Sequence, residues 1–133
     1  DTKYLNHTPA ILFWGDGFKK PYPFERDILV PVSQKRVDDL AMIASCHECQ
    51  YFDWMYWPDH TDKIAWPREK QVADLAARYR RGLAQVRDEA EDALTAKYGA
   101  DTAALITHLE CFEISEYGEA PCAEFLRVAE AAE

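Results

Sequence analysis

The 133-residue sequence has no hydrophobic run long enough to cross a bilayer, which takes about 20 consecutive apolar residues. It also lacks a basic segment followed by an apolar one at its start, so no secretory signal is predicted. Positive charge is scarce, with 15 Lys and Arg against 24 Asp and Glu and a net charge of -9. Because nucleic-acid binding needs a basic surface, this charge argues against that class of function. The first residue is Asp1 rather than Met, which suggests a trimmed start.

Cysteine is also too sparse for a small secreted scaffold held together by disulfides. The chain has four cysteines, Cys46, Cys49, Cys111 and Cys122. We therefore expect a reducing compartment, the cytoplasm by default. There, Cys111 and Cys122 are expected to be unpaired packing residues in preference to a disulfide, whereas the spacing of Cys46 and Cys49 indicates a redox or metal pair.

The apolar spacing predicts helices and no strand ladder or internal repeat. Residues 1–32 contain four prolines and are expected to form an irregular aromatic arm with a short helix at residues 9–14. Ser33 is a predicted N-cap for a helix that runs to Trp57, whose second half is apolar on nearly every side and so is expected to be buried. The prediction is a single all-α domain over residues 1–133, with the arm at 1–32 and a helical core at 33–133.

Three further helices complete this expected core. Pro67 suits the first turn of a long helix that is closed by Gly99. The alternative is two helices with a break near Gly82. A helix capped by Asp101 is expected to carry apolar residues at helical spacing, namely Leu105, Leu109 and Phe112. A short terminal helix is predicted after Pro121, with Phe125 and Leu126 on its apolar face.

The segment "ASCHECQYFDWMYW", residues 44–57, carries the chemistry that the sequence suggests most strongly. Cys46 and Cys49 are three residues apart, so their sulfurs would lie within one helical turn of each other. A thiolate in such a pair is the nucleophile of peroxide reduction and of thiol–disulfide exchange. His47 is a candidate proton relay near neutral pH, and Glu48 is a candidate proton acceptor. The alternative is that both cysteines are small core residues.

Two metal-site interpretations stay open beside the redox one. "CHEC" and "HLEC" (108–111) combine into a tetrahedral zinc set of Cys46, Cys49, His108 and Cys111. Structural zinc sites usually lie on turns, and both segments are predicted to be helical, so no metal and no cofactor is the expectation. The acidic cluster around the helix end, Asp53, Asp59, His60 and Asp62, is more typical of a solvated loop than of a cation site.

The middle of the chain resembles the carboxymuconolactone decarboxylase and alkylhydroperoxidase-D-like superfamily. The resemblance is carried by "RVDDLAMIASCHECQYFD", which is similar to an apolar helix ending in a C-x-x-C-x-x-x-H motif. The segments "KIAWPREKQVADL" and "DALTAKYGADTAALITHLECFEISEYGEAPCAEFL" are similar to the later helices of that superfamily, and "LNHTPAILFWGDG" to its opening segment. The resemblance covers most of residues 5–128.

The resemblance implies an all-helical hairpin or bundle that assembles as a trimer or hexamer. It also implies that Cys49 attacks the peroxide and that Cys46 closes the disulfide. The chain departs from the family pattern at two positions, because Gln34 stands where the family has a glutamate and Asp53 where it has the motif histidine. Either the proton relay falls to Glu48, Asp53 or His60, of which His60 is preferred, or the activity differs from that of the family.

Three functions from different classes follow. The first is a thiol-based oxidoreductase that acts on a peroxide or a disulfide with a thiol reductant. The second is an acid–base enzyme on a small cyclic acid or lactone, with His47 or His60 beside an aromatic pocket of Tyr51, Trp54 and Tyr56. The third is a non-enzymatic acidic helical protein that docks an apolar surface on a partner. A homo-oligomer is expected, without nucleic acid or membrane as a partner.

Overall fold

The computed structural model describes residues 11–16, 21–53 and 63–131. The chain forms two compact units, the first made of residues 1–32 with 84–133 and the second of residues 33–83. This division differs from the predicted arm at 1–32 and core at 33–133, because the arm belongs with the C-terminal half of the chain. None of the described helices is both long and apolar enough to span a membrane.

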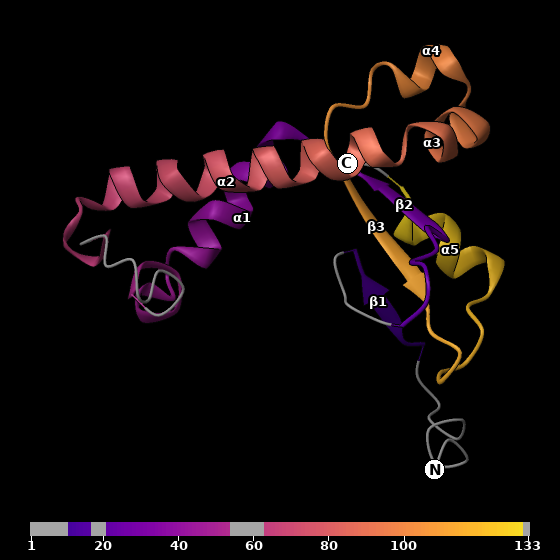
Figure 1. The fold of residues 1–133 in the computed structure, drawn as a ribbon, viewed down its shortest axis with the longest axis horizontal. Coiled ribbons are helices and arrows are strands. Elements are labelled where there is room, and N and C mark those ends of the chain that lie inside the picture. Colours follow the sequence, from indigo (N-terminus) through magenta and orange to yellow (C-terminus); the bar gives the residue numbers. More distant parts are fainter. Residues whose placement is uncertain (1–10, 17–20, 54–62, 132–133) are drawn as a thin grey trace. The chain divides into compact units, whose positions relative to one another are not determined.

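The all-α prediction is wrong, because the first unit contains a three-stranded antiparallel sheet. Its strands are β1 (Phe13–Gly15), β2 (Ile28–Pro31) and β3 (Leu109–Ile114), in the order β1-β3-β2. Figure 1 shows β3 between the two N-terminal strands. In the register, Phe13 lies opposite Ile114 and Leu29 lies opposite Cys111. The predicted irregular arm therefore supplies two of the three strands.

The segment around β3 explains why a helix was predicted there. Leu105, Leu109 and Phe112 have helical spacing, but only Ala100–Ala103 (α4) is helical in this stretch, and Leu105 is 81% exposed. From Leu109 onward, burial alternates at every second residue, which is the period of a strand. Glu113 conceals this alternation in the sequence, because it is a buried carboxylate whose Oε2 accepts a hydrogen bond from the Glu25 backbone N–H at 2.6 Å.

The helices of the first unit cover one face of the sheet. They are α3 (Glu91–Tyr98), α4 and the end of α2 (Arg68–Glu89). Gly99 closes α3 as predicted: its φ of 80° suits glycine, and its N–H donates to the Thr95 carbonyl. The predicted long helix is broken at Ala90 and not near Gly82, since α2 ends at Glu89 and α3 begins at Glu91.

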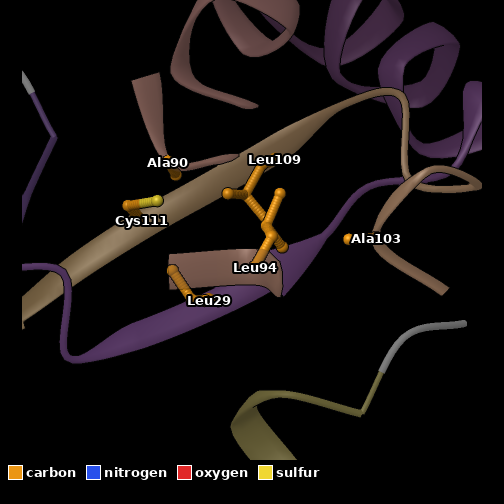
Figure 2. Close-up of a cluster of buried hydrophobic side chains, with 6 residues drawn as sticks. All are labelled: Leu29, Ala90, Leu94, Ala103, Leu109 and Cys111. Carbon is orange, nitrogen blue, oxygen red and sulfur yellow. The ribbon is translucent and has the colours of Figure 1, made fainter. Parts of the chain in front are cut away.

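The core of the first unit lies between this helical cover and the sheet. Figure 2 shows its side chains, which come from β2, β3 and the helices: Leu29, Ala90, Leu94, Ala103, Leu109 and Cys111. Leu94 and Leu109 are both fully buried. Arg87 holds the end of α4 and the segment after it against this core. Its Nε donates to the Ile106 carbonyl at 2.9 Å, and its Nη2 donates to the Ala103 carbonyl at 3.2 Å.

The other face of the sheet is covered by α5 (Ala123–Ala129). The ring of Phe125 stacks on that of Phe13, with centroids 5.7 Å apart and planes 7° apart. Between helix and sheet lies an apolar cavity of about 230 Å³, lined by Phe13, Ile28, Val30, Phe112, Phe125 and Ala129. The sheet is therefore apolar on both faces, as expected of a strand layer packed between helices.

The second unit is a helical hairpin built on α1 (Gln34–Ala44) and the first part of α2. Ser33 caps α1 as predicted, because its Oγ accepts from the Arg36 N–H at 3.2 Å. The core of this unit uses small side chains on both helices and one large ring, namely Ala41, Ala44, Phe52, Leu75 and Ala76. Four of these five side chains belong to α1 and α2, so the cluster joins the two helices.

The predicted helix over residues 33–57 is interrupted. It ends at Ala44, and after a turn at Ser45–His47 the chain forms a π-helical turn, η2 (Cys49–Asp53). Residues 54–57 lie outside the described part of the chain. Both thiols are exposed: Cys46 lies in the turn after α1, and Cys49 is the first residue of η2, so the pair does not lie inside one buried helix.

Cys111 makes the stability of the first unit depend on alkaline pH. Burial raises the pKa of its thiol from the ordinary value of 9.0 to about 11. Between these two values the folded chain keeps a proton that the unfolded chain has lost, so the free energy of unfolding falls as the pH rises through this window. Burial also raises the pKa of Tyr98 in this unit above 10.0, and that of Tyr79 in the second unit to about 12, which extends the fall in the stability of the chain beyond pH 10.0.

We therefore predict that the chain becomes easier to unfold above pH 9.0, the ordinary pKa of the thiol. Urea denaturation followed by circular dichroism at several pH values on both sides of 9.0 measures this. Because the tyrosines titrate higher, a Cys111→Ala variant should lose most of the decline below pH 10.0. An equally steep decline in the variant would contradict the role given to Cys111.

Candidate functional site

The candidate site is the exposed turn that carries Cys46 and Cys49. The core holds the chain on both sides of this turn, since Ala44 is 5% exposed and Phe52 is 1% exposed. All four residues between Ser45 and Gln50 are exposed. Two buried anchors thus hold a short segment at the surface, where both thiols meet solvent. The π-helical turn that follows is a local feature often associated with functional sites.

Arg68, the first residue of α2, connects this turn to the second helix. Its Nη1 donates to the Ser45 carbonyl, and its Nη2 donates to the Cys46 Sγ at 3.5 Å. Cys46 Sγ in turn donates to the Met42 carbonyl at 3.5 Å. The guanidinium therefore closes the C-terminal end of α1 and places a fixed positive charge beside one sulfur. A cation so placed stabilises a thiolate.

The two cysteines differ in these surroundings. Among the described residues, no hydrogen bond or ion pair reaches Cys49 Sγ, whereas Cys46 Sγ has both Arg68 and the Met42 carbonyl. Even a fully extended chain would place the Cα atoms of Cys46 and Cys49 at most about 11 Å apart. Backbone hydrogen bonds on both sides of His47 shorten this distance. His47 N–H donates to the Ala44 carbonyl at 3.0 Å, and the Gln50 N–H donates to the His47 carbonyl at 3.1 Å. The pair is therefore compact, and both thiols are free.

The predicted proton-transfer residues lie at different distances from this pair. Glu48 is 59% exposed, and its Oε1 is 3.9 Å from Arg68 Nη1, a separation longer than a hydrogen bond. His47 and Asp53 are exposed, and no hydrogen bond joins either one to a cysteine in the described part of the chain. His60, Asp59 and Asp62 lie outside the described residues. Of the predicted acid–base groups that the structure describes, Glu48 is the one that forms an ion pair with Arg68.

The predicted zinc set is not assembled. Cys46 and Cys49 belong to the second unit and His108 and Cys111 to the first. Cys111 is 2% exposed in the core, and His108 Nδ1 makes a 2.9 Å hydrogen bond with Thr107 Oγ1. No group of three or more metal-ligating side chains occurs in residues 11–16, 21–53 and 63–131.

The remaining cysteine is exposed and structural. Cys122 is the N-cap of α5, and its Sγ accepts a hydrogen bond from the Phe125 N–H at 3.4 Å. It is not bonded to Cys111, in agreement with the sequence-based preference for unpaired thiols. Serine, a good N-cap residue, is a conservative replacement there.

Parts of the second predicted function fall on undescribed residues. Of its proposed aromatic pocket, Trp54 and Tyr56 lie outside the described part. Tyr51 is partly buried, and its hydroxyl accepts a 3.4 Å hydrogen bond from Tyr79. Burial and this contact with Tyr51 raise the pKa of Tyr79 to about 12, so the Tyr79 phenol stays protonated at neutral pH.

Arg68 was missed by sequence reasoning, although a signal for it exists. A positive charge in the first turn of a helix opposes the helix dipole, so an arginine directly after the helix-starting Pro67 requires a partner. The partner here is the C-terminal end of α1, whose carbonyls carry the complementary partial charge. That partner becomes visible only once α1 is known to end at Ala44.

Comparisons with known proteins do not add to this description. No family model matches the chain, no curated protein matches it, and no solved structure matches it.

Proposed function

We propose that the chain is a thiol oxidoreductase in which Cys46 and Cys49 undergo thiol–disulfide exchange. The observation that carries the proposal is the hydrogen bond from Arg68 Nη2 to an exposed Cys46 Sγ. A reactive cysteine needs access to its substrate and a positive charge that stabilises the thiolate. Cys46 has both, whereas Cys111 lacks access to a substrate: it is buried, and although Arg26 lies beside it and lowers its pKa, burial outweighs this effect and raises the pKa to about 11.

In the proposed reaction, the Cys46 thiolate attacks one sulfur of a substrate disulfide. A bond forms between Cys46 Sγ and that sulfur, the substrate S–S bond breaks, and the other substrate half leaves as a thiolate. Cys49 then loses its proton to solvent or to the leaving thiolate and attacks Cys46 Sγ, which releases the second half. The substrate is thereby reduced to two thiols, and the protein is oxidised to the Cys46–Cys49 disulfide. An external dithiol then reduces this disulfide and restores both thiols.

This assignment gives Cys46 the first attack, in contrast to the superfamily resemblance, which implies Cys49. The difference in surroundings supports the reversal, because the guanidinium lies beside Cys46. The related peroxide reaction uses the same pair: the Cys46 thiolate attacks a peroxide oxygen, the O–O bond breaks and the alcohol or water leaves, so that Cys46 becomes a sulfenic acid. Cys49 then condenses with it to form the disulfide and release water. A chain with a free, exposed dithiol suits a reducing compartment, and we propose the cytoplasm. Assembly as a trimer or hexamer stays a prediction.

Replacing Arg68 by Gln tests the proposal. The variant loses the positive charge beside Cys46, and since the Arg68 side chain is 43% exposed, the effect should be that of a solvent-screened pair. We expect Cys46 to react with iodoacetamide roughly two- to fivefold more slowly. Alkylation followed by peptide mass spectrometry gives this rate for each cysteine separately.

Two comparisons make the test specific. Arg68→Lys keeps the charge and should retain more reactivity than Arg68→Gln, whereas the rate at Cys122 should not change in either variant. Equal rates at Cys46 in the original chain and in Arg68→Gln would remove the support for the proposal.

The non-enzymatic alternative has its own observation. Met42 and Ile43, on the last turn of α1, are 53% and 57% exposed. A partner that covered these two side chains would also cover Cys46, so partner binding and thiol exchange compete for one surface. If the function is binding alone, a Cys46→Ser variant should bind its partner as the original chain does.

A further inference from the structure

A groove in the second unit lies beside the residues that contact the reactive thiol. It has a volume of about 440 Å³ and is lined by residues of α1 and α2: Asp38, Met42, Arg68, Glu69, Val72, Ala73, Ala76 and Arg80. Two of these residues are the ones that contact Cys46 Sγ, since Arg68 donates to the sulfur and the Met42 carbonyl accepts from it. Cys46 itself does not line the groove, but through these two contacts it adjoins the end where Arg68 lies.

The size of the groove fits a small molecule. Small-molecule sites have volumes of about 300–1,000 Å³, and the volume of the groove falls within this range. The middle of the groove is apolar, with Met42 on one side and Val72, Ala73 and Ala76 on the other. This surface accommodates an aliphatic group.

The charges at the thiol end favour a carboxylate. A guanidinium has five N–H donors, and the hydrogen bonds to Ser45 and Cys46 use two of those of Arg68. Its nearest carboxylate, Glu48, is 3.9 Å away and exposed. At the far end, about 18 Å along α2, Arg80 is instead paired with Asp38 at 3.0 Å. Arg68 is therefore the groove cation with donors to offer, and Glu69 is the acidic residue beside it.

We propose that the groove binds a low-molecular-weight aliphatic disulfide that carries a carboxylate, with the carboxylate at Arg68 and one sulfur at Cys46. This substrate class depends on the exchange reaction proposed above. Cys46 attacks the nearer sulfur, the distant half leaves as a thiol, and attack by Cys49 releases the half that holds the carboxylate. The net charge of -9 repels anions in general, so a preference for an anionic disulfide would have to come from the site.

Three disulfides of matched length test the proposal on the reduced full chain. Dithiodipropionate is an anion, hydroxyethyl disulfide is neutral and cystamine is a cation. Each rate of exchange is divided by the rate of the same disulfide with mercaptoethanol, which removes differences in intrinsic reactivity. We expect the normalised rate to be highest for dithiodipropionate, roughly two- to fivefold above hydroxyethyl disulfide, and lowest for cystamine.

Variants assign the preference to the groove. Arg68→Gln should reverse the order, because only the overall negative charge then remains. Arg81→Gln, an exposed arginine on the same helix that does not line the groove, should keep the original order. Ala73→Phe fills the middle of the groove and should slow the reaction of Cys46 with dithiodipropionate more than its reaction with iodoacetamide.

The two proposals fail in different ways. If hydroxyethyl disulfide oxidises the pair but the anion has no advantage, or keeps it in Arg68→Gln, the substrate class is wrong and the exchange reaction stands. If none of the three disulfides oxidises the pair, both proposals are wrong. An advantage for cystamine in the original chain would also overturn the substrate class.

Discussion

A Cys46→Ser variant is expected to lose the capacity to release both halves of a disulfide substrate. In the proposed order, Cys46 makes the mixed disulfide and Cys49 resolves it, so without Cys46 no disulfide can form within the turn. Cys49→Ser should behave differently, because Cys46 still attacks and the mixed disulfide accumulates. Intact-protein mass spectrometry after treatment with hydroxyethyl disulfide separates the two variants, since only the second should carry a stable adduct at the site.

Cys122→Ser is the matched control for this experiment. Cys122 is also exposed, but it caps α5 in the other unit, and serine supplies an equivalent cap. This variant should form the Cys46–Cys49 disulfide at the original rate. If instead Cys46→Ser accumulates the adduct at Cys49 as fast as Cys49→Ser does at Cys46, the guanidinium gives Cys46 no advantage and the assignment of roles is wrong.

A Leu94→Ala variant is expected to destabilise the first unit by about 2–5 kcal/mol, as for other fully buried leucines. Leu94 is completely buried and packs with Leu29, Leu109 and Cys111 where α3 meets the sheet. Truncation removes apolar burial and leaves a space that this small core cannot easily close. Urea denaturation monitored by far-ultraviolet circular dichroism gives the change in the free energy of unfolding.

Leu105→Ala provides the comparison, because the Leu105 side chain is 81% exposed. Its effect should stay within about 0.5 kcal/mol. The two positions also distinguish the sheet from the helix that the sequence pattern indicates over the same residues. A helix with Leu105, Leu109 and Phe112 on its buried face would make Leu105→Ala costly, and that result would contradict the observed fold.

The parts of the fold that follow local rules were predictable from sequence. Ser33 caps α1 and Gly99 closes α3 because each end depends on one residue and its immediate neighbours. The sheet depends on distant pairing, since β3 lies between two strands of a proline-rich segment about 80–100 residues earlier. The buried Glu113 also masked the alternation of β3, because its carboxylate finds a partner at Glu25.

The candidate site was predictable in part for the same reason. The Cys46 and Cys49 pair is visible as a motif, but its exposure follows from the end of α1 at Ala44, where a longer helix was predicted. Arg68 is 22 residues beyond Cys46, and no periodicity links the two. Only the packing of α2 against α1 brings the guanidinium to the sulfur.

The most direct test of the account is to map the disulfide formed when the reduced chain meets one equivalent of hydroxyethyl disulfide. Digestion under non-reducing conditions followed by mass spectrometry identifies which cysteines are joined. The account predicts a bond between Cys46 and Cys49, release of both halves of the reagent, and free thiols at Cys111 and Cys122. Two unmodified thiols at Cys46 and Cys49, or a stable adduct on either one, would contradict it.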